Sequence, residues 1–340
     1  MHHINRRSFL KTASLAAAAP GLSMVAGRAY AAAEFTLRYA NNLPVTHPMN
    51  IRAREMAARI NAESKGRVEF QVFPNNQLGG DKDMFSQLRS GAIDFFMLSP
   101  LILGTYIPAA QISGIGFAFK DYNAVWAAID GELGAHVRQL IEEKPIFAFE
   151  KIWNNGFRQI TTASRPIAHV KDLQGVKLRV PTSPIWTSMF KSLGASPASV
   201  DFAETYSALQ THVVEGQENP LAIIYTAKLY EVQKYCSMTN HMWDGFWCLG
   251  NKSSFARLPP DLQAIIRNAV NDAGMKERQD VDALERETRG KLEAAGMKFN
   301  DVDQGEFQQQ LRTSGFYADW QKQFGPQAWA LLEKYAGKLG

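Results

Sequence analysis

The sequence predicts an α/β protein of two lobes joined at a hinge, and three observations support this fold class. The chain has 340 residues, which is long for one hydrophobic core and suits two. Short alternating segments recur between segments with helical periodicity, which is typical of parallel strands connected by helices. The series begins twice, and the chain is expected to cross between the lobes near residues 157 and 240.

The first series opens with a strand, a helix and a strand. Residues 34–40 and 67–73 alternate as strands, and residues 51–64 carry apolar side chains at helical spacing. Such a unit implies parallel pairing. The elements expected next are a helix from Asp81 to Gly91, a buried strand over 93–98, one or two helices over 121–143 and a strand over 146–153.

The second series restarts at Ile160. Residues 175–181 form a short strand between a glycine turn and Pro181. Further strands are expected over 199–202, 230–238 and 243–251, with an edge strand near 297–299. Helices are expected over 185–193 and 203–211, as one long helix or two joined helices over 259–295, and as a tail over 307–338.

The N-terminus is typical of a secretory signal peptide. Arg6 and Arg7 precede an alanine-rich apolar run, and the small residues Ala29 and Ala31 mark a cleavage site. The paired arginines indicate the twin-arginine export route. Removal of residues 1–31 lowers the formal net charge from +4 to about zero, so the basic balance does not indicate nucleic-acid binding. No later stretch is apolar and long enough to span a bilayer, and a protein that is not membrane-embedded is expected.

Familiar catalytic and metal-binding motifs are absent from the sequence, so neither an enzyme nor a metal or cofactor site is predicted. No nucleophile elbow, phosphate loop or dinucleotide fingerprint occurs, and the histidines have no metal-ligand spacing. The two cysteines, Cys236 and Cys248, are expected to be small buried residues, although export leaves a disulfide open.

The residues near the predicted strand ends suit the binding of an organic anion. Arg158 and Arg179 supply positive charge, and a guanidinium matches a carboxylate in a bidentate pair. Amides and flat aromatic rings surround them in the sequence: Asn42, Asn154, Asn155, Asn219, Trp153, Trp186, Phe202, Trp243 and Trp247. Alternation places Trp243 and Trp247 on one strand face and Asp244 and Phe246 on the other, so they cannot all line one pocket.

Six motifs in order resemble the solute-binding proteins of TRAP (tripartite ATP-independent periplasmic) transporters. The resemblance covers essentially the whole chain after the signal peptide. The motifs are NNQLG at 75–79, GFRQIT at 156–161, GVKLRV at 175–180, FAETY at 202–206, VEGQENP at 214–220 and KYCSMTNH at 234–241.

The resemblance implies a periplasmic-binding-protein clamshell with a long helix across both lobes. Lobe I would comprise residues 34–156 and 245–284, and lobe II residues 157–244 and 285–340. By the same resemblance, Arg179 is the carboxylate-binding arginine, Arg158 a second ligand arginine and Asn219 the amide beside it. Phe202, Asn42 and Ser99 also fall at pocket positions. Sialic-acid binders carry an acidic residue where this chain has Ser99.

The predicted function is that of a periplasmic binding protein that captures a small organic acid and delivers it to the membrane subunits of an ion-driven TRAP permease. The tryptophans favour an aromatic or apolar monocarboxylate. The complete predicted set of ligand contacts is Arg179, Arg158, Asn219, Phe202, Trp186, Trp153, Asn155, Asn42, Ser99 and Trp243. A sugar acid or short hydroxy acid, a ligand-sensing subunit for a membrane kinase, and an exported enzyme remain open alternatives.

Overall fold

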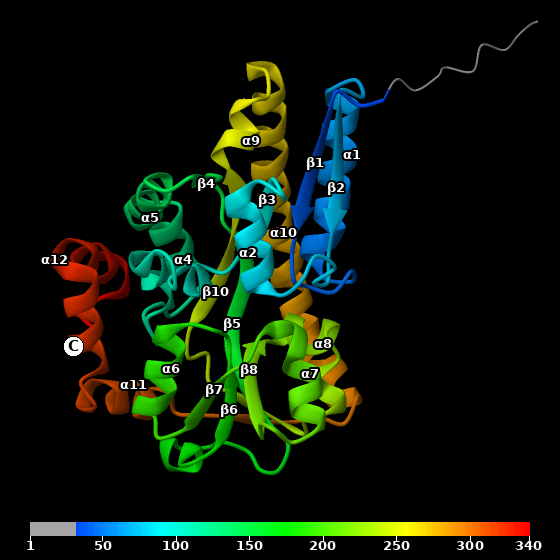
Figure 1. The fold of residues 1–340 in the computed structure, drawn as a ribbon. Helices are drawn as coiled ribbons and strands as arrows, with labels where there is room; N and C mark the ends of the chain where they lie inside the picture. Colours follow the sequence, from blue (N-terminus) through cyan, green and yellow to red (C-terminus); the bar gives the residue numbers. More distant parts are fainter. Residues whose placement is uncertain (1–31) are drawn as a thin grey trace, which may run out of the picture. The chain divides into compact units, whose positions relative to one another are not determined.

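The computed structural model describes residues 32–340, and residues 33–340 form one compact unit (Figure 1). The predicted signal peptide lies outside the described residues. The unit is built on a mixed sheet of 11 strands, with helices along the connections. The expected α/β class is therefore confirmed. None of the helices in residues 32–340 has the length and apolar character that a bilayer crossing needs.

The first part of the sheet follows the expected strand, helix and strand. β1 (Phe35–Ala40) pairs in parallel with β2 (Val68–Phe73) and with β3 (Phe95–Leu98). The connecting helices are α1 (Pro48–Glu63) and α2 (Asp81–Ser90). Proline begins α1, and the side chain of His47 accepts a hydrogen bond from the Met49 N–H at its start. The next elements are α3 (Pro100–Leu103), η1 (Pro108–Gly114), α4 (Tyr122–Ile129), α5 (Glu132–Glu142) and β4 (Ile146–Ala148).

Two long strands join the parts of the sheet. β10 (Trp243–Asn251) pairs with β3 and β4 toward its end, and with β5 (Trp153–Thr162) toward its start, in antiparallel orientation throughout. The register shifts between Asp244 and Gly245, which leaves Asn155 of β5 without a partner opposite it. Gly156 follows with a φ of +122°, a conformation that L side chains rarely adopt. The connection therefore carries a β-bulge, a feature that re-aims side chains.

The second part of the sheet is also mixed. β6 (Lys177–Val180) pairs in parallel with β7 (Ser196–Ser199) and β8 (Gly216–Pro220). β8 and β9 (Tyr235–Met238) both pair antiparallel with β5, and β11 (Lys298–Asp301) pairs in parallel with β9. The other elements here are η2 (Val170–Leu173), α6 (Pro184–Ser192), α7 (Phe202–Gln210), α8 (Leu221–Thr226) and η3 (Leu229–Glu231).

Three predicted strands were wrong in extent. Residues 146–153 do not form one strand, because β4 ends at Ala148, the chain bends at Glu150 and Lys151, and β5 begins only at Trp153. The strand expected over 199–202 ends at Ser199. Asp201 then accepts the Ala203 N–H and caps α7, so the segment after it is helical. Of residues 230–238, only the last four are a strand, after the turn of η3.

A single helix of 35 residues, α10 (Pro260–Ala294), contacts α1, β5 and α8 and thus both parts of the sheet (Figure 1). Gly274 does not break it but admits a close neighbour, since a Cβ there would lie 2.7 Å from Trp153 Nε1. The remaining helices are α9 (Lys252–Ala256), α11 (Gln304–Thr313) and α12 (Phe316–Ala336). α12 packs against η1, α4 and α5, although the predicted division assigns it to lobe II. That division stays a prediction.

The buried apolar side chains form three clusters that flank the sheet. Trp243 belongs to the largest cluster and Trp153 to the second, which also contains Cys248. Cys236 lies in the third, near α8 and β9. Both cysteines are buried and free, as expected for small core residues. A disulfide between them is not formed.

Candidate ligand-binding site

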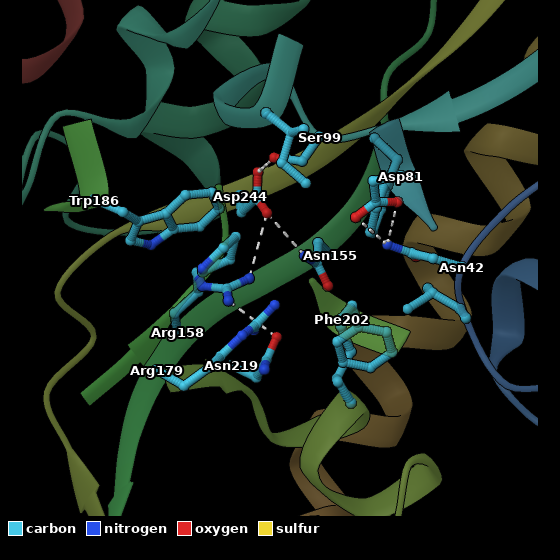
Figure 2. A pocket seen from close by; sticks show the side chains of 15 residues that line it. Asn42, Asp81, Ser99, Asn155, Arg158, Arg179, Trp186, Phe202, Asn219 and Asp244 are labelled. Atoms are coloured by element: carbon cyan, nitrogen blue, oxygen red, sulfur yellow. Dashed lines mark hydrogen bonds and ion pairs between the residues drawn. The ribbon is translucent and has the colours of Figure 1, made fainter. Parts of the chain in front are cut away.

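A pocket lies where the two parts of the sheet meet (Figure 2). Its walls come from the loop after β1, the start of α2, the end of β3, the linking strands β5 and β10, and the ends of β6 and β8. The lining residues are Asn42, Leu43, Asp81, Ser99, Ile102, Asn155, Arg158, Arg179, Pro181, Trp186, Phe202, Asn219, Ile223, Asp244 and Phe246.

Arg179 is the cation in this wall that the protein leaves unsatisfied. Its side chain is 1% exposed, and its Nε donates to the Val200 carbonyl at 2.9 Å. Nη1 has no hydrogen-bond partner, and no ion pair within 4.0 Å joins Arg179 to any residue of 32–340. Burial lowers the pKa of Arg179 to about 10. A buried guanidinium with a spare N–H directed at a cavity is a site for an anion.

Arg158, in contrast, is already held by the protein. Its Nε and Nη2 bind the two carboxylate oxygens of Glu218 at 2.5 and 2.8 Å, and Nη2 also reaches Asn219 Oδ1 at 2.9 Å. The Trp186 ring lies 4.8 Å from the guanidinium carbon and covers it. Burial would raise the pKa of Glu218, but Arg158 outweighs it and holds that pKa below its ordinary value. Arg158 thus forms a neutral buried pair with Glu218.

A second acidic group lies at the bulge of the linking strands. The Asp244 carboxylate accepts hydrogen bonds from Ser99 Oγ at 2.7 Å and from Asn155 Nδ2 at 3.0 Å. Arg158 Nη1 approaches the same group at 3.3 Å. Burial nevertheless raises the pKa of Asp244 to about 6. Because Asn155 donates to Asp244, its Oδ1 carries the free acceptor, and this oxygen has no partner.

A third polar group lies on the side of the cavity away from Arg158 and Trp186 (Figure 2). Asn42 Nδ2 donates to both oxygens of Asp81, at 2.9 and 3.2 Å, and Asn42 Oδ1 has no partner. Burial raises the pKa of Asp81 to about 7, and the nearby Asp201 adds to this effect. This wall therefore presents carboxylate and amide oxygens that accept hydrogen bonds when Asp81 is ionised.

Eight of the ten predicted contact residues line the cavity, and two do not. Trp153 packs in the core behind β5 against α10, and Trp243 packs in the largest cluster with its Nε1 bonded to Asn154 Oδ1 at 2.9 Å. Asp244 and Phe246 occupy the cavity face of β10 instead. The strand alternation contained this signal, because it separated Trp243 from those two residues.

Sequence reasoning missed Asp81 as well as Asp244. Asp81 is the first residue of α2, where an acidic side chain is ordinary for a helix N-terminus, so the sequence offers no separate sign of a cavity role. The missed apolar residues are Leu43, Ile102, Pro181, Ile223 and Phe246. Within residues 32–340, no three His, Cys, Asp or Glu side chains are grouped so that they could hold a metal ion.

The cavity leaves four buried polar atoms without partners, two donors and two acceptors. The donors are Arg179 Nη1 and Trp186 Nε1, and the acceptors are Asn42 Oδ1 and Asn155 Oδ1. Leaving such atoms unpaired is costly, so a ligand that pairs them is strongly favoured. A pocket between the two parts of an α/β sheet, with apolar walls and a few placed polar groups, is typical of a site that binds a small molecule.

Comparison with known proteins identifies the family. The model for bacterial extracellular solute-binding protein, family 7, matches residues 39–322, so the chain belongs to this family. The sialic acid-binding periplasmic protein of Vibrio cholerae is 32% identical over 260 residues, which cover 76% of this chain and 81% of the relative. The TRAP resemblance seen in the six motifs is therefore confirmed, and the proteins of this family are periplasmic solute-binding proteins.

Solved structures agree with this assignment. A TRAP periplasmic solute-binding protein of Sulfurospirillum deleyianum with bound succinate has a TM-score of 0.84 and 28% identity, covering 90% of this chain and 99% of that one. A TRAP protein of Roseobacter denitrificans with bound L-galactonate has a TM-score of 0.83 and 30% identity, covering 88% and 99%. The chain thus has the two-lobed fold of the TRAP binding proteins.

Proposed function

We propose that the protein captures a small hydroxylated monocarboxylate of the sugar-acid class and delivers it to a TRAP permease. One observation carries the proposal, namely the buried Arg179 with a spare Nη1 in a cavity that also holds free amide oxygens. The guanidinium pairs with the carboxylate of the ligand, and Asn155 and Asn42 accept hydrogen bonds from its hydroxyl groups.

The polar atoms of the wall favour this class over the aromatic or apolar acid suggested by the tryptophans. Trp153 and Trp243 lie outside the cavity, and Trp186 covers Arg158. An apolar ligand body would leave Asn42 Oδ1 and Asn155 Oδ1 buried without partners. The L-galactonate complex of the Roseobacter relative supports the same ligand class.

The remaining parts of the proposal concern assembly and movement. Lobe I at 34–156 with 245–284, and lobe II at 157–244 with 285–340, would close over the ligand by bending at β5 and β10. Export through the twin-arginine route would bring the protein to the periplasm, and the closed form would present the ligand to the permease. The protein is proposed to bind its ligand without chemical change, because the family to which it belongs is one of solute-binding proteins.

A thermal-shift panel of organic acids tests the ligand class. It contains D-galactonate, L-galactonate, D-glucuronate, succinate, benzoate and 4-hydroxybenzoate. A bound acid at about 100 times its Kd should stabilise the protein by about 2.7 kcal/mol. Stabilisation by the benzoates and not by the sugar acids would overturn the hydroxylated class and restore the aromatic one.

Two further measurements address the alternative functions. Mass spectrometry of the ligand after prolonged incubation should recover it unchanged, whereas a changed mass would indicate an enzyme. Co-purification with detergent-solubilised permease in the presence of D-galactonate tests the transport role. Association with a membrane kinase in place of a permease would favour the sensor alternative.

A further inference from the structure

The wall formed by Asn42 and Asp81 differs in chemistry from the wall that holds the arginines. Asn42 Nδ2 donates to the two oxygens of Asp81, at 2.9 and 3.2 Å, and Asn42 Oδ1 has no partner within the protein. Asp81 is 4% exposed and lines the cavity. The oxygens of this pair, including the unpaired Asn42 Oδ1, are hydrogen-bond acceptors while Asp81 is ionised.

The charges around Asp81 make this wall more acidic than the pair alone. Asp201, at the N-cap of α7, binds the Asp81 backbone N–H through Oδ2 at 3.0 Å, so a second carboxylate lies next to Asp81. Asp83 is exposed on the same helix. The one nearby cation with an effect on Asp81 is Arg179 of β6. Burial and Asp201 together raise the pKa of Asp81 to about 7.

A count of charges shows what the cavity can neutralise. Arg158 is compensated by Glu218, and its contact with Asp244 at 3.3 Å adds a further negative group. Arg179 is the remaining cation, and Asp81 and Asp201 already act on it from the other wall, so no cation is left for a second carboxylate of the ligand. A second carboxylate next to Asp81 would find no cation, since like charges about 4 Å apart repel by roughly 4 kcal/mol at an effective dielectric constant of about 20.

We infer that Asp81 determines specificity at the end of the ligand away from the anchored carboxylate, where it accepts a hydroxyl group and excludes a second carboxylate. The inference rests on the proposed binding of hydroxylated acids and goes beyond it, because it separates monocarboxylates from dicarboxylates of the same length. This chain would therefore reject dicarboxylates, unlike the Sulfurospirillum relative with its bound succinate.

Matched pairs of ligands test the inference. D-galactonate and galactarate share their hydroxyl groups and differ only at C6, where a CH₂OH is replaced by a carboxylate. D-gluconate and glucarate form a second pair. Isothermal titration at about pH 8 should give a Kd for each diacid at least ~100-fold weaker than for its monoacid, well within the repulsion expected for a buried like-charge pair.

Asp81→Asn removes the negative charge and retains an acceptor oxygen. This substitution should lower the ratio of the diacid Kd to the monoacid Kd at least ~10-fold, and it should change the Kd of the monoacid by less than ~10-fold. Asp83→Asn is the matched control, because it removes the same charge from the same turn of α2 but on the exposed face. For Asp83→Asn, the ratio of the diacid Kd to the monoacid Kd should equal that of the wild type.

Acid titration of the wild type provides a second measurement that needs no variant. Lowering the pH from about 8 to about 5.5 protonates Asp81 while the diacid stays doubly charged. The ratio of the diacid Kd to the monoacid Kd should therefore fall at least ~10-fold. Equal binding of monoacid and diacid at high pH, or an unchanged ratio in Asp81→Asn, would overturn the inference and leave the proposed function standing. Failure of every monoacid to bind the wild type would overturn both.

Discussion

Arg179 provides the sharpest test of the site, because a ligand anchor and a structural arginine respond differently to removal. Arg179→Met keeps most of the side-chain volume and removes the guanidinium. Within residues 32–340, the native guanidinium makes one hydrogen bond, to the Val200 carbonyl, and no ion pair. Lowering of its pKa to about 10 means that burial disfavours the charged form by roughly 3 kcal/mol. Its loss should therefore not destabilise the ligand-free protein.

The loss of ligand affinity should be large. Truncating one partner of a buried charge pair costs about 2–5 kcal/mol, which corresponds to an increase in Kd of roughly 30- to 5,000-fold. Part of that cost is the carboxylate of the ligand left in a closed cavity without a cation. The combination of lost affinity and retained stability is the expected signature of an anchor.

Arg158→Met is the matched comparison, since both arginines are buried in the same wall. Its removal leaves Glu218 buried without its ion-pair partner, which should destabilise the protein by about 3–5 kcal/mol even without ligand. The assay is urea denaturation of each ligand-free variant, followed by titration with D-galactonate. If Arg179→Met lost as much stability as Arg158→Met, or bound D-galactonate as tightly as the wild type, the anchor role would be refuted.

Three further predictions follow from other buried groups. A bound anion favours protonated Asp81, whose pKa burial raises to about 7. The Kd of D-galactonate should therefore rise above about pH 7, by less than ~10-fold in total up to about pH 9. A flat titration profile from about pH 6 to 9 would contradict this. Burial raises the pKa of Glu285 to about 8, so the native state holds a proton that the unfolded state has lost. The free energy of unfolding of the wild type should therefore fall as the pH rises from about 4.5 to 8, by up to about 1.4 kcal/mol per pH unit. Urea denaturation of Glu285→Gln over the same pH range should show a smaller fall. Gly156→Ala should destabilise the protein by at least about 2 kcal/mol, because φ is +122° and the new Cβ would lie 2.1 Å from Glu285 Oε1. Gly290→Ala is the control: a Cβ there has nothing within 4 Å, so this substitution should stabilise α10 by up to about 1 kcal/mol. Equal effects of the two substitutions in thermal denaturation would refute the strain at Gly156.

The site shows where sequence reasoning succeeds and where it stops. Arg179 lies in a strand that the local pattern predicted, whereas no strand was predicted for β8, which carries Asn219. The six motifs assigned the roles of both residues by resemblance. Trp153 and Trp243 were chosen because large aromatic rings suit a binding wall, yet such rings suit a core equally well. Their burial against α10 and in the largest cluster depends on elements more than 80 residues away in the chain.

The linking strands show the same limit in the backbone. The alternation of side chains along residues 243–247 predicted the two faces correctly: Asp244 and Phe246 line the pocket, and Trp243 and Trp247 lie in the core. The bulge that leaves Asn155 unpaired arises from the register between β5 and β10, which local sequence does not contain. The capped start of α7 at Asp201 was readable in principle, since Asp is a preferred N-cap residue, but the short apolar run before it also suited a strand.

Periodicity and motifs within short segments were sufficient to predict the α/β class and the membership of the solute-binding family. They left open whether residues 259–295 form one helix or two, and the structure shows one. The tertiary structure alone decided which charges are neutralised. Arg158 and Arg179 look equivalent in the sequence, yet Glu218 compensates one and no acidic side chain pairs with the other in the described part of the chain. This difference between the two arginines arises from burial and from the partners that the sheet brings together. It leaves Arg179 as the arginine that would bind the carboxylate of a ligand.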